Sequence, residues 1–150
     1  MSLPRFLLLG ALLLASQIVP LRAEKDDLLQ LLHSRSYDAA ADALERFNRQ
    51  PGDDPAEVAL LETALQIPID PFNMQRIHAL IYAGLLQRGK AGEEVLFKRA
   101  KNEKESFFTR MSAVTALRSY YPNLLRPEID AIAAELMKHA AAEINPDPSP

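Results

Sequence analysis

Residues 70–86, which read DPFNMQRIHALIYAGLL, decide the fold class of this chain. Asp70 is suited to cap a helix N-terminus, and Pro71 is suited to the first helical position. Apolar residues then recur at helical spacing, which predicts one buried helix face: Ile77, Leu80, Ile81 and Leu85. Gly84 falls on the same stripe, and a mid-helix glycine costs about 1 kcal/mol relative to alanine. We therefore expect a packing reason for it, and we expect Ala79 and Ala83 to let another helix approach closely.

The same start signal occurs upstream, in Asp54-Pro55-Ala56-Glu57. Asp54 is the expected cap, worth on the order of 1 kcal/mol, and Glu57 has the spacing of a capping box. Val58, Leu61 and Leu65 form the expected buried face of that helix. Further upstream, two more apolar stripes follow the helical period: Leu28, Leu31 and Leu32, then Tyr37, Ala40, Ala41, Leu44 and Phe47.

Downstream of residue 86 the pattern remains helical. Gly89 and Gly92 are expected to bracket the exit from the 70–86 helix, and a shorter helix is expected from Glu93 to Asn102. Two further stripes predict two more helices, the second opened by Asn123 or Pro127: Phe107, Met111, Val114, Leu117 and Tyr121, then Ile129, Ile132, Ala133, Leu136, Met137 and Ala140. No segment alternates with period two.

These patterns predict an all-α fold of about seven short antiparallel helices, packed as an irregular α-solenoid or a helical bundle. The helical domain is expected to cover residues 24–143. The Pro-rich residues 144–150 are expected to form a disordered tail.

The N-terminus has the pattern of a signal peptide. Arg5 supplies a positive charge, and Phe6 to Val19 is an uncharged, mostly apolar run, shorter than the roughly 20 residues that a spanning helix needs. We expect residues 1–23 to be cleaved after Ala23, with a cut after Ala15 or Ser16 as an alternative. An uncleaved inner-membrane signal anchor and a buried N-terminal helix are the other interpretations. The expected location is therefore the periplasm or the medium.

Composition narrows the function classes. The chain has no Cys, which excludes thiol nucleophiles, thiolate metal sites and a lipid anchor on a cysteine. It carries 17 Lys+Arg and 20 Asp+Glu. Because Arg5 and Arg22 lie in the leader, the remainder has a net charge of about −5, whereas a nucleic-acid binder needs a basic surface. We expect no nucleic-acid partner, and no membrane contact in the mature form unless the leader is uncleaved.

Two stretches resemble known helical repeats. Tyr37-Asp38-Ala39-Ala40, followed by Leu44, Phe47 and Pro51, resembles the second half of a tetratricopeptide unit. The stretch from Thr109 to Leu117, followed by the helix from Pro127 to Met137, resembles helices of HEAT-type units. Both families are α-solenoids, so the resemblance implies a protein-binding surface and no active site.

Catalytic and metal motifs are sparse. His33, His78 and His139 lack the spacing of a helical metal pair, and no Gly-rich phosphate loop or nucleophile elbow occurs, so we expect no cofactor and no metal. His78 is the one candidate for acid–base chemistry, if Asp70 or Glu62 lies beside it. A small exported enzyme or enzyme accessory with a site near His78 is therefore the alternative function.

The leading expectation is a non-enzymatic binding or adaptor module that engages another protein through a helical face. An immunity or inhibitor protein would look the same in sequence. The segment from Arg88 to Glu105 is dense in charge and is expected to be mainly a solvated helix face. If it carries a partner surface, that surface joins the lysines to neighbouring exposed aromatic residues: Lys98, Lys101, Lys104, Phe108 and Tyr120.

Overall fold

The computed structural model describes residues 27–50, 52, 54–120 and 126–144, and for residues 120, 126, 143 and 144 it describes the backbone alone. Within these ranges the protein is all-helical, as predicted, with seven helices and no strand. Residues 27–33 form the first. The others are α2 (Tyr37–Asn48), α3 (Pro55–Ala64), α4 (Pro71–Leu86), α5 (Gly89–Lys101), α6 (Phe107–Tyr120) and α7 (Arg126–Ile144). The leader and the residues after Ile144 lie outside the described ranges.

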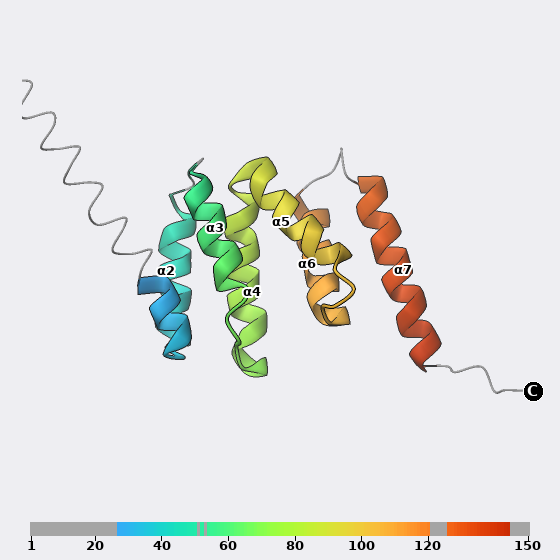
Figure 1. Cartoon of the computed structure of the whole chain (residues 1–150), viewed down its shortest axis with the longest axis horizontal. Coiled ribbons are helices and arrows are strands. Elements are labelled where there is room, and N and C mark those ends of the chain that lie inside the picture. Colours follow the sequence, from blue (N-terminus) through green and yellow to red (C-terminus); the bar gives the residue numbers. More distant parts are fainter. Residues whose placement is uncertain (1–26, 51, 53, 121–125, 145–150) are drawn as a thin grey trace, which may run out of the picture.

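The helices stand side by side in chain order, from α2 on the left of Figure 1 to α7 on the right. Contacts also link alternate helices: α2 touches α4 and α4 touches α6, while α3 touches α5 and α5 touches α7. Two rows of helices therefore face each other, and the apolar core fills the space between them.

Both predicted capping residues act as expected. The Asp54 side chain accepts a hydrogen bond from the amide of Ala56 at 2.9 Å. The Asp70 carboxylate accepts from the amides of Phe72 and Asn73, both at 3.1 Å. A further hydrogen bond from the Asn73 side chain is the main cause that lowers the pKa of Asp70. The two Asp-Pro pairs thus set where α3 and α4 begin.

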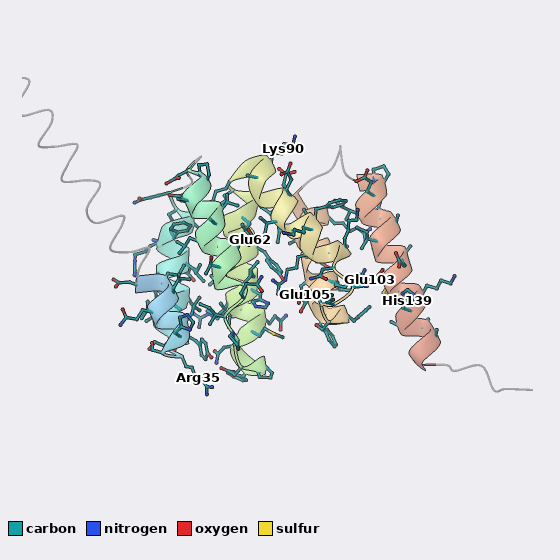
Figure 2. All side chains as sticks on the ribbon, in the orientation of Figure 1. Arg35, Glu62, Lys90, Glu103, Glu105 and His139 are labelled. Carbon is teal, nitrogen blue, oxygen red and sulfur yellow. The ribbon has the colours of Figure 1, made fainter. Side chains whose placement is uncertain are left out.

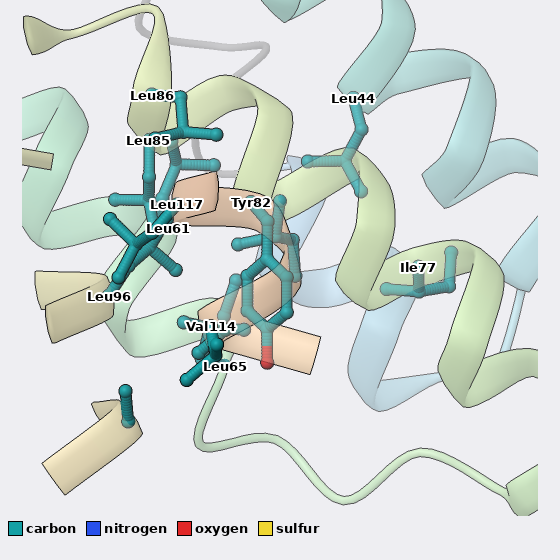
Figure 3. Packing of buried hydrophobic residues seen from close by; sticks show 14 of the residues in the cluster. Leu44, Leu61, Leu65, Ile77, Tyr82, Leu85, Leu86, Leu96, Val114 and Leu117 are labelled. Carbon is teal, nitrogen blue, oxygen red and sulfur yellow. The ribbon is translucent and has the colours of Figure 1, made fainter. Parts of the chain in front are cut away.

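The predicted stripes supply the core. Side chains from every described helix are buried in it, among them Leu32, Leu44, Leu61, Ile81, Leu85, Leu96, Leu117 and Ile129. Figure 3 shows Tyr82 in the same cluster with Val114 and Leu117 of α6. Two stripe assignments were wrong at individual positions: Met137 is 56 % exposed, and Phe107 is 37 % exposed.

Gly84 has the packing reason that its position predicted. A Cβ there would lie 2.5 Å from Oδ1 of Asn48, whose side-chain amide donates to the carbonyl of Leu80 at 2.9 Å. Gly92 differs from the prediction because it lies inside α5, which begins at Gly89. A Cβ on Gly92 would overlap the carbonyl of Leu85, so this glycine lets α5 approach α4.

Glu57 and Arg88 form a buried ion pair that the sequence did not predict. Nε and Nη2 of Arg88 each lie 2.9 Å from Oε2 of Glu57, and Nη1 donates to the carbonyl of Gly84 at 2.7 Å. The Arg88 guanidinium also lies 4.0 Å from the ring centroid of Phe47. Arg88 was expected on a solvated face, but it is buried. Its ion pair with Glu57 joins α3 to the end of α4.

Candidate functional site

The candidate site is a groove between α4 and α6 with a volume of about 670 Å³. This volume lies within the range of about 300–1,000 Å³ typical of ligand pockets. Its α4 wall is Pro71, Met74, Gln75, His78, Ala79, Tyr82, Ala83, Leu86 and Gln87. Its α6 wall is Phe108, Thr109, Met111, Ser112, Thr115 and Ala116. Both walls follow the helical period, so each helix contributes one long stripe.

Short side chains hollow out this groove. Ala79 and Ala83 of α4 are exposed, as are Ser112 and Thr115 of α6. They occupy the faces of the two helices that the core does not use. The sequence predicted that Ala79 and Ala83 would let another helix approach; within the described residues no helix fills that place.

The groove carries no formal charge at neutral pH. No Lys, Arg, Asp or Glu lines it. Burial, and then the positive charge of Arg99, lowers the pKa of His78 from 6.5 to about 4, which keeps the imidazole neutral at pH 7. Burial raises the pKa of Tyr82, whose ring centroid lies 5.9 Å from that of His78. An occupant with a charged buried face would therefore meet no counter-charge.

The acid–base pair expected as an alternative for His78 is not formed. Asp70 caps α4. Glu62 belongs to α3, and its Oε1 lies 4.0 Å from Nζ of Lys98 in α5. Among the described residues His78 makes no hydrogen bond or ion pair with a carboxylate; its ring lies beside that of Tyr82, and the charged group that acts on it is Arg99. The described part of the chain also holds no group of three His, Cys, Asp or Glu side chains that could bind a metal ion.

The residues of the partner surface predicted from sequence do not all line one hollow in the structure. Phe108 lines the groove and is 73 % exposed. Lys98 instead lines a smaller polar hollow of about 100 Å³, together with Glu62, Arg99 and Glu105. Figure 2 labels Glu62 and Glu105, which belong to this second hollow.

The remaining members of that surface lie outside both hollows. The ammonium of Lys101 lies 5.2 Å from the ring centroid of Phe97, and Lys104 is exposed in the turn before α6. The side chain of Tyr120 is outside the described part of the structure. Of the five predicted residues, Phe108 alone is therefore shown to line the groove.

Sequence reasoning missed most of the groove, although a signal was present. In an otherwise charged chain, α4 and α6 carry a second stripe of uncharged residues beside the core stripe: Gln75, Ala79, Ala83, Ser112 and Thr115 are examples. When a helix has two uncharged faces and one of them packs in the core, the other uncharged face stays on the surface. Which two helices place such faces opposite each other depends on the packing, which the sequence pattern does not contain.

No described helix is both long and apolar enough to cross a lipid bilayer. The resemblance to tetratricopeptide and HEAT units stays a prediction. No protein-family model, no curated protein and no solved structure matches the chain significantly.

Proposed function

We propose that this protein is an exported, non-enzymatic binding module that receives the apolar face of a helix from a partner protein in the α4/α6 groove. The observation that carries the proposal is the uncharged groove of about 670 Å³ with the exposed ring of Phe108 on its wall. An adaptor and an inhibitor would use this surface in the same way.

The shape of the groove supports a helical occupant. The wall on α4 runs from Pro71 to Gln87, and the 16 residues of α4 extend for about 24 Å. Amphipathic helices bind in apolar grooves through side chains spaced three and four residues apart. The short side chains of Ala79, Ala83 and Ser112 leave room for larger side chains of a partner, as in ridges-into-grooves packing.

Phe108 is the expected anchor of the interaction. Aromatic residues are enriched in the protein interfaces of known complexes, and few residues supply most of the binding free energy. Phe108 is exposed in the free protein, so its burial by a partner would contribute binding energy without loss of a core contact. Export through the leader, with the cut after Ala23, completes the proposal and places the partner outside the cytoplasm.

The test is differential capture with a C-terminally tagged chain produced in its own host, so that any leader processing occurs as it normally does. Ala83→Arg places a charge in the groove, and Ala59→Arg is the matched control on an exposed position of α3. Proteins that bind the groove should be retained by the unmodified chain and by Ala59→Arg, and reduced at least about tenfold on Ala83→Arg. Identical capture by all three chains contradicts the proposal.

A further inference from the structure

We propose that the helix received by the α4/α6 groove is α6 of a second copy of this chain, so that the protein forms a homodimer through the groove. This inference rests on the proposed function and names its partner. In such a dimer each copy presents its own α6 and receives the α6 of the other copy.

The exposed ridge of α6 has the features expected of the occupant. Its members follow the helical period and none of them is charged: Phe108, Ser112, Thr115 and Ser119. The ridge thus carries one large aromatic side chain, which is 73 % exposed, followed by three short ones. Short side chains allow two helices to approach closely, and an aromatic side chain can fill a hollow. A groove without formal charge can bury this ridge and leave no charge unpaired.

The charge of this face suits a second copy. Identical acidic surfaces repel each other, and the chain as a whole carries 20 Asp+Glu against 17 Lys+Arg. In contrast, α4 and α6 contain no Asp or Glu, and their charged residues are Arg76, Arg110 and Arg118. Arg76 lies 2.8 Å from Asp38. Arg118 lies 3.1 Å from Asp130, and Arg110 donates to a backbone carbonyl of α5 at 2.9 Å. Two copies can therefore bring these faces together without repulsion between acidic groups.

The position of α6 makes the contact reciprocal. Helix α6 forms one wall of the groove and α4 forms the other. When α6 of a second copy lies in the groove, it lies against α6 of the first copy. A two-fold axis that runs along these two helices then places each α6 in the groove of the other copy. Both grooves are filled by one symmetric contact, and the assembly closes at two copies.

The wall of the groove also contains a polar group that a second copy can satisfy. The imidazole of His78 is half-buried and makes no hydrogen bond with any described residue. A partner that covers His78 must supply a hydrogen-bonding group, because a buried polar group without one is destabilising. A fully apolar helix has no such group, whereas the exposed hydroxyls of Ser112 and Thr115 on α6 can donate or accept. Helix α6 thus combines an aromatic anchor with the polar groups that this wall needs.

The size of the contact predicts a weak dimer. The 14 residues of α6 extend for about 21 Å, and two helices packed 8–10 Å apart form a face about 20 Å wide. Each copy therefore contributes about 400 Å² in projection, and complexes that bury less than about 1,200 Å² in total are weak and reversible. We expect a dissociation constant of about 10–100 µM.

Sedimentation velocity of the chain purified from its own host tests the dimer, over a concentration series from about 1 to 500 µM. Ala83→Arg and Ser112→Arg each place a charge on one wall of the groove, and Ala59→Arg is the matched control on α3. We expect the unmodified chain and Ala59→Arg to dimerise equally. Both groove variants should dimerise at least about ten times more weakly, because each charge enters the symmetric contact twice. Far-UV circular dichroism checks that each variant is folded.

Crosslinking gives a second reading that needs no charged variant, because the chain has no native cysteine. Ser112→Cys places a thiol on the ridge of α6, beside the two-fold axis, and Ala59→Cys is the control on α3. A short bismaleimide should link two copies at position 112 at least ten times faster than at position 59, as read by mass.

A chain that stays monomeric throughout the concentration series overturns the inference. A dimer that both groove variants leave intact overturns it as well, and so do equal crosslinking rates at positions 112 and 59. If the chain is monomeric while Ala83→Arg abolishes capture of a different protein, the proposed function stands and the second copy as its partner fails. If the groove dimer forms while Ala83→Arg leaves the capture of every other protein unchanged, the groove serves self-association and a different partner protein is ruled out.

Discussion

Replacement of Arg88 by methionine should destabilise the fold severely. The guanidinium makes two 2.9 Å contacts with Oε2 of Glu57 and one 2.7 Å hydrogen bond to the carbonyl of Gly84. The side chains of Arg88 and Glu57 are only 1 % and 6 % exposed. Methionine keeps much of the volume of Arg88 and removes the charge. The carboxylate of Glu57 then stays buried and loses its ion pair with Arg88.

The size of the effect follows from that burial. Breaking a buried ion pair by removing one partner costs about 3–5 kcal/mol, because the other charge is left uncompensated. Loss of the contact with the ring of Phe47 adds to this cost. Domains of this size have a total stability of about 5–15 kcal/mol. With a urea m-value of about 1.5 kcal/mol/M, the unfolding midpoint should fall by about 2–3 M.

The assay is urea unfolding followed by far-UV circular dichroism. The double variant Glu57→Met with Arg88→Met should recover most of the loss, since an apolar pair can replace a buried ion pair at little cost. The control is Arg76→Met, which breaks a 2.8 Å pair with Asp38 whose side chains are 51 % and 94 % exposed. That change should cost less than about 1 kcal/mol. A loss below about 1 kcal/mol for Arg88→Met, or a double variant less stable than the single one, would refute the reasoning.

Three further changes test other parts of the structure. Gly92→Ala should lower stability by about 1–3 kcal/mol in thermal unfolding, because the new Cβ overlaps the carbonyl of Leu85. An unchanged or higher melting temperature would show that the interface between α4 and α5 can accommodate the added methyl group. Since the pKa of His78 is lowered to about 4, the unfolded chain binds a proton there at higher pH than the folded chain does. The stabilising contribution of the neutral His78 side chain is therefore fully present above pH 6.5 and is lost as the pH falls toward 4. His78→Gln should reduce this pH-dependent loss of stability, as measured by unfolding curves between pH 7.5 and 4.5. Phe108→Ala should change stability by no more than about 0.5 kcal/mol, because the ring is largely exposed, yet it should weaken partner capture; a destabilised variant would mean that Phe108 serves the fold.

Local signals in the sequence were sufficient to identify the helices, although α5 begins at Gly89 and not at Glu93 as expected. Asp54-Pro55 and Asp70-Pro71 each place a capping carboxylate next to a residue that suits the first helical turn, and both act that way in the structure. The stripe of Ile77, Ile81 and Leu85 identified the buried face of α4 for the same reason. These features depend on residues within one or two turns of each other.

Features that join distant residues were not accessible to the same reasoning. Glu57 and Arg88 are 31 positions apart, and each has an ordinary local explanation, as a capping-box residue and as part of a charged segment. The groove likewise depends on α4 and α6 meeting with their uncharged second faces toward the same space. Phe108 was selected from sequence because a helix cannot bury both members of the Phe107-Phe108 doublet on one face, which is a local argument.

Site-specific photocrosslinking in the native host tests the central claim most directly. A photoreactive residue replaces Ala83 in the groove, and in a second chain it replaces Ala59 on α3. If the groove receives a partner helix, the processed chain should form a discrete protein adduct from position 83 and none from position 59. Adducts of equal yield from both positions, or an adduct from position 59 alone, would contradict the assignment of the groove as the binding surface.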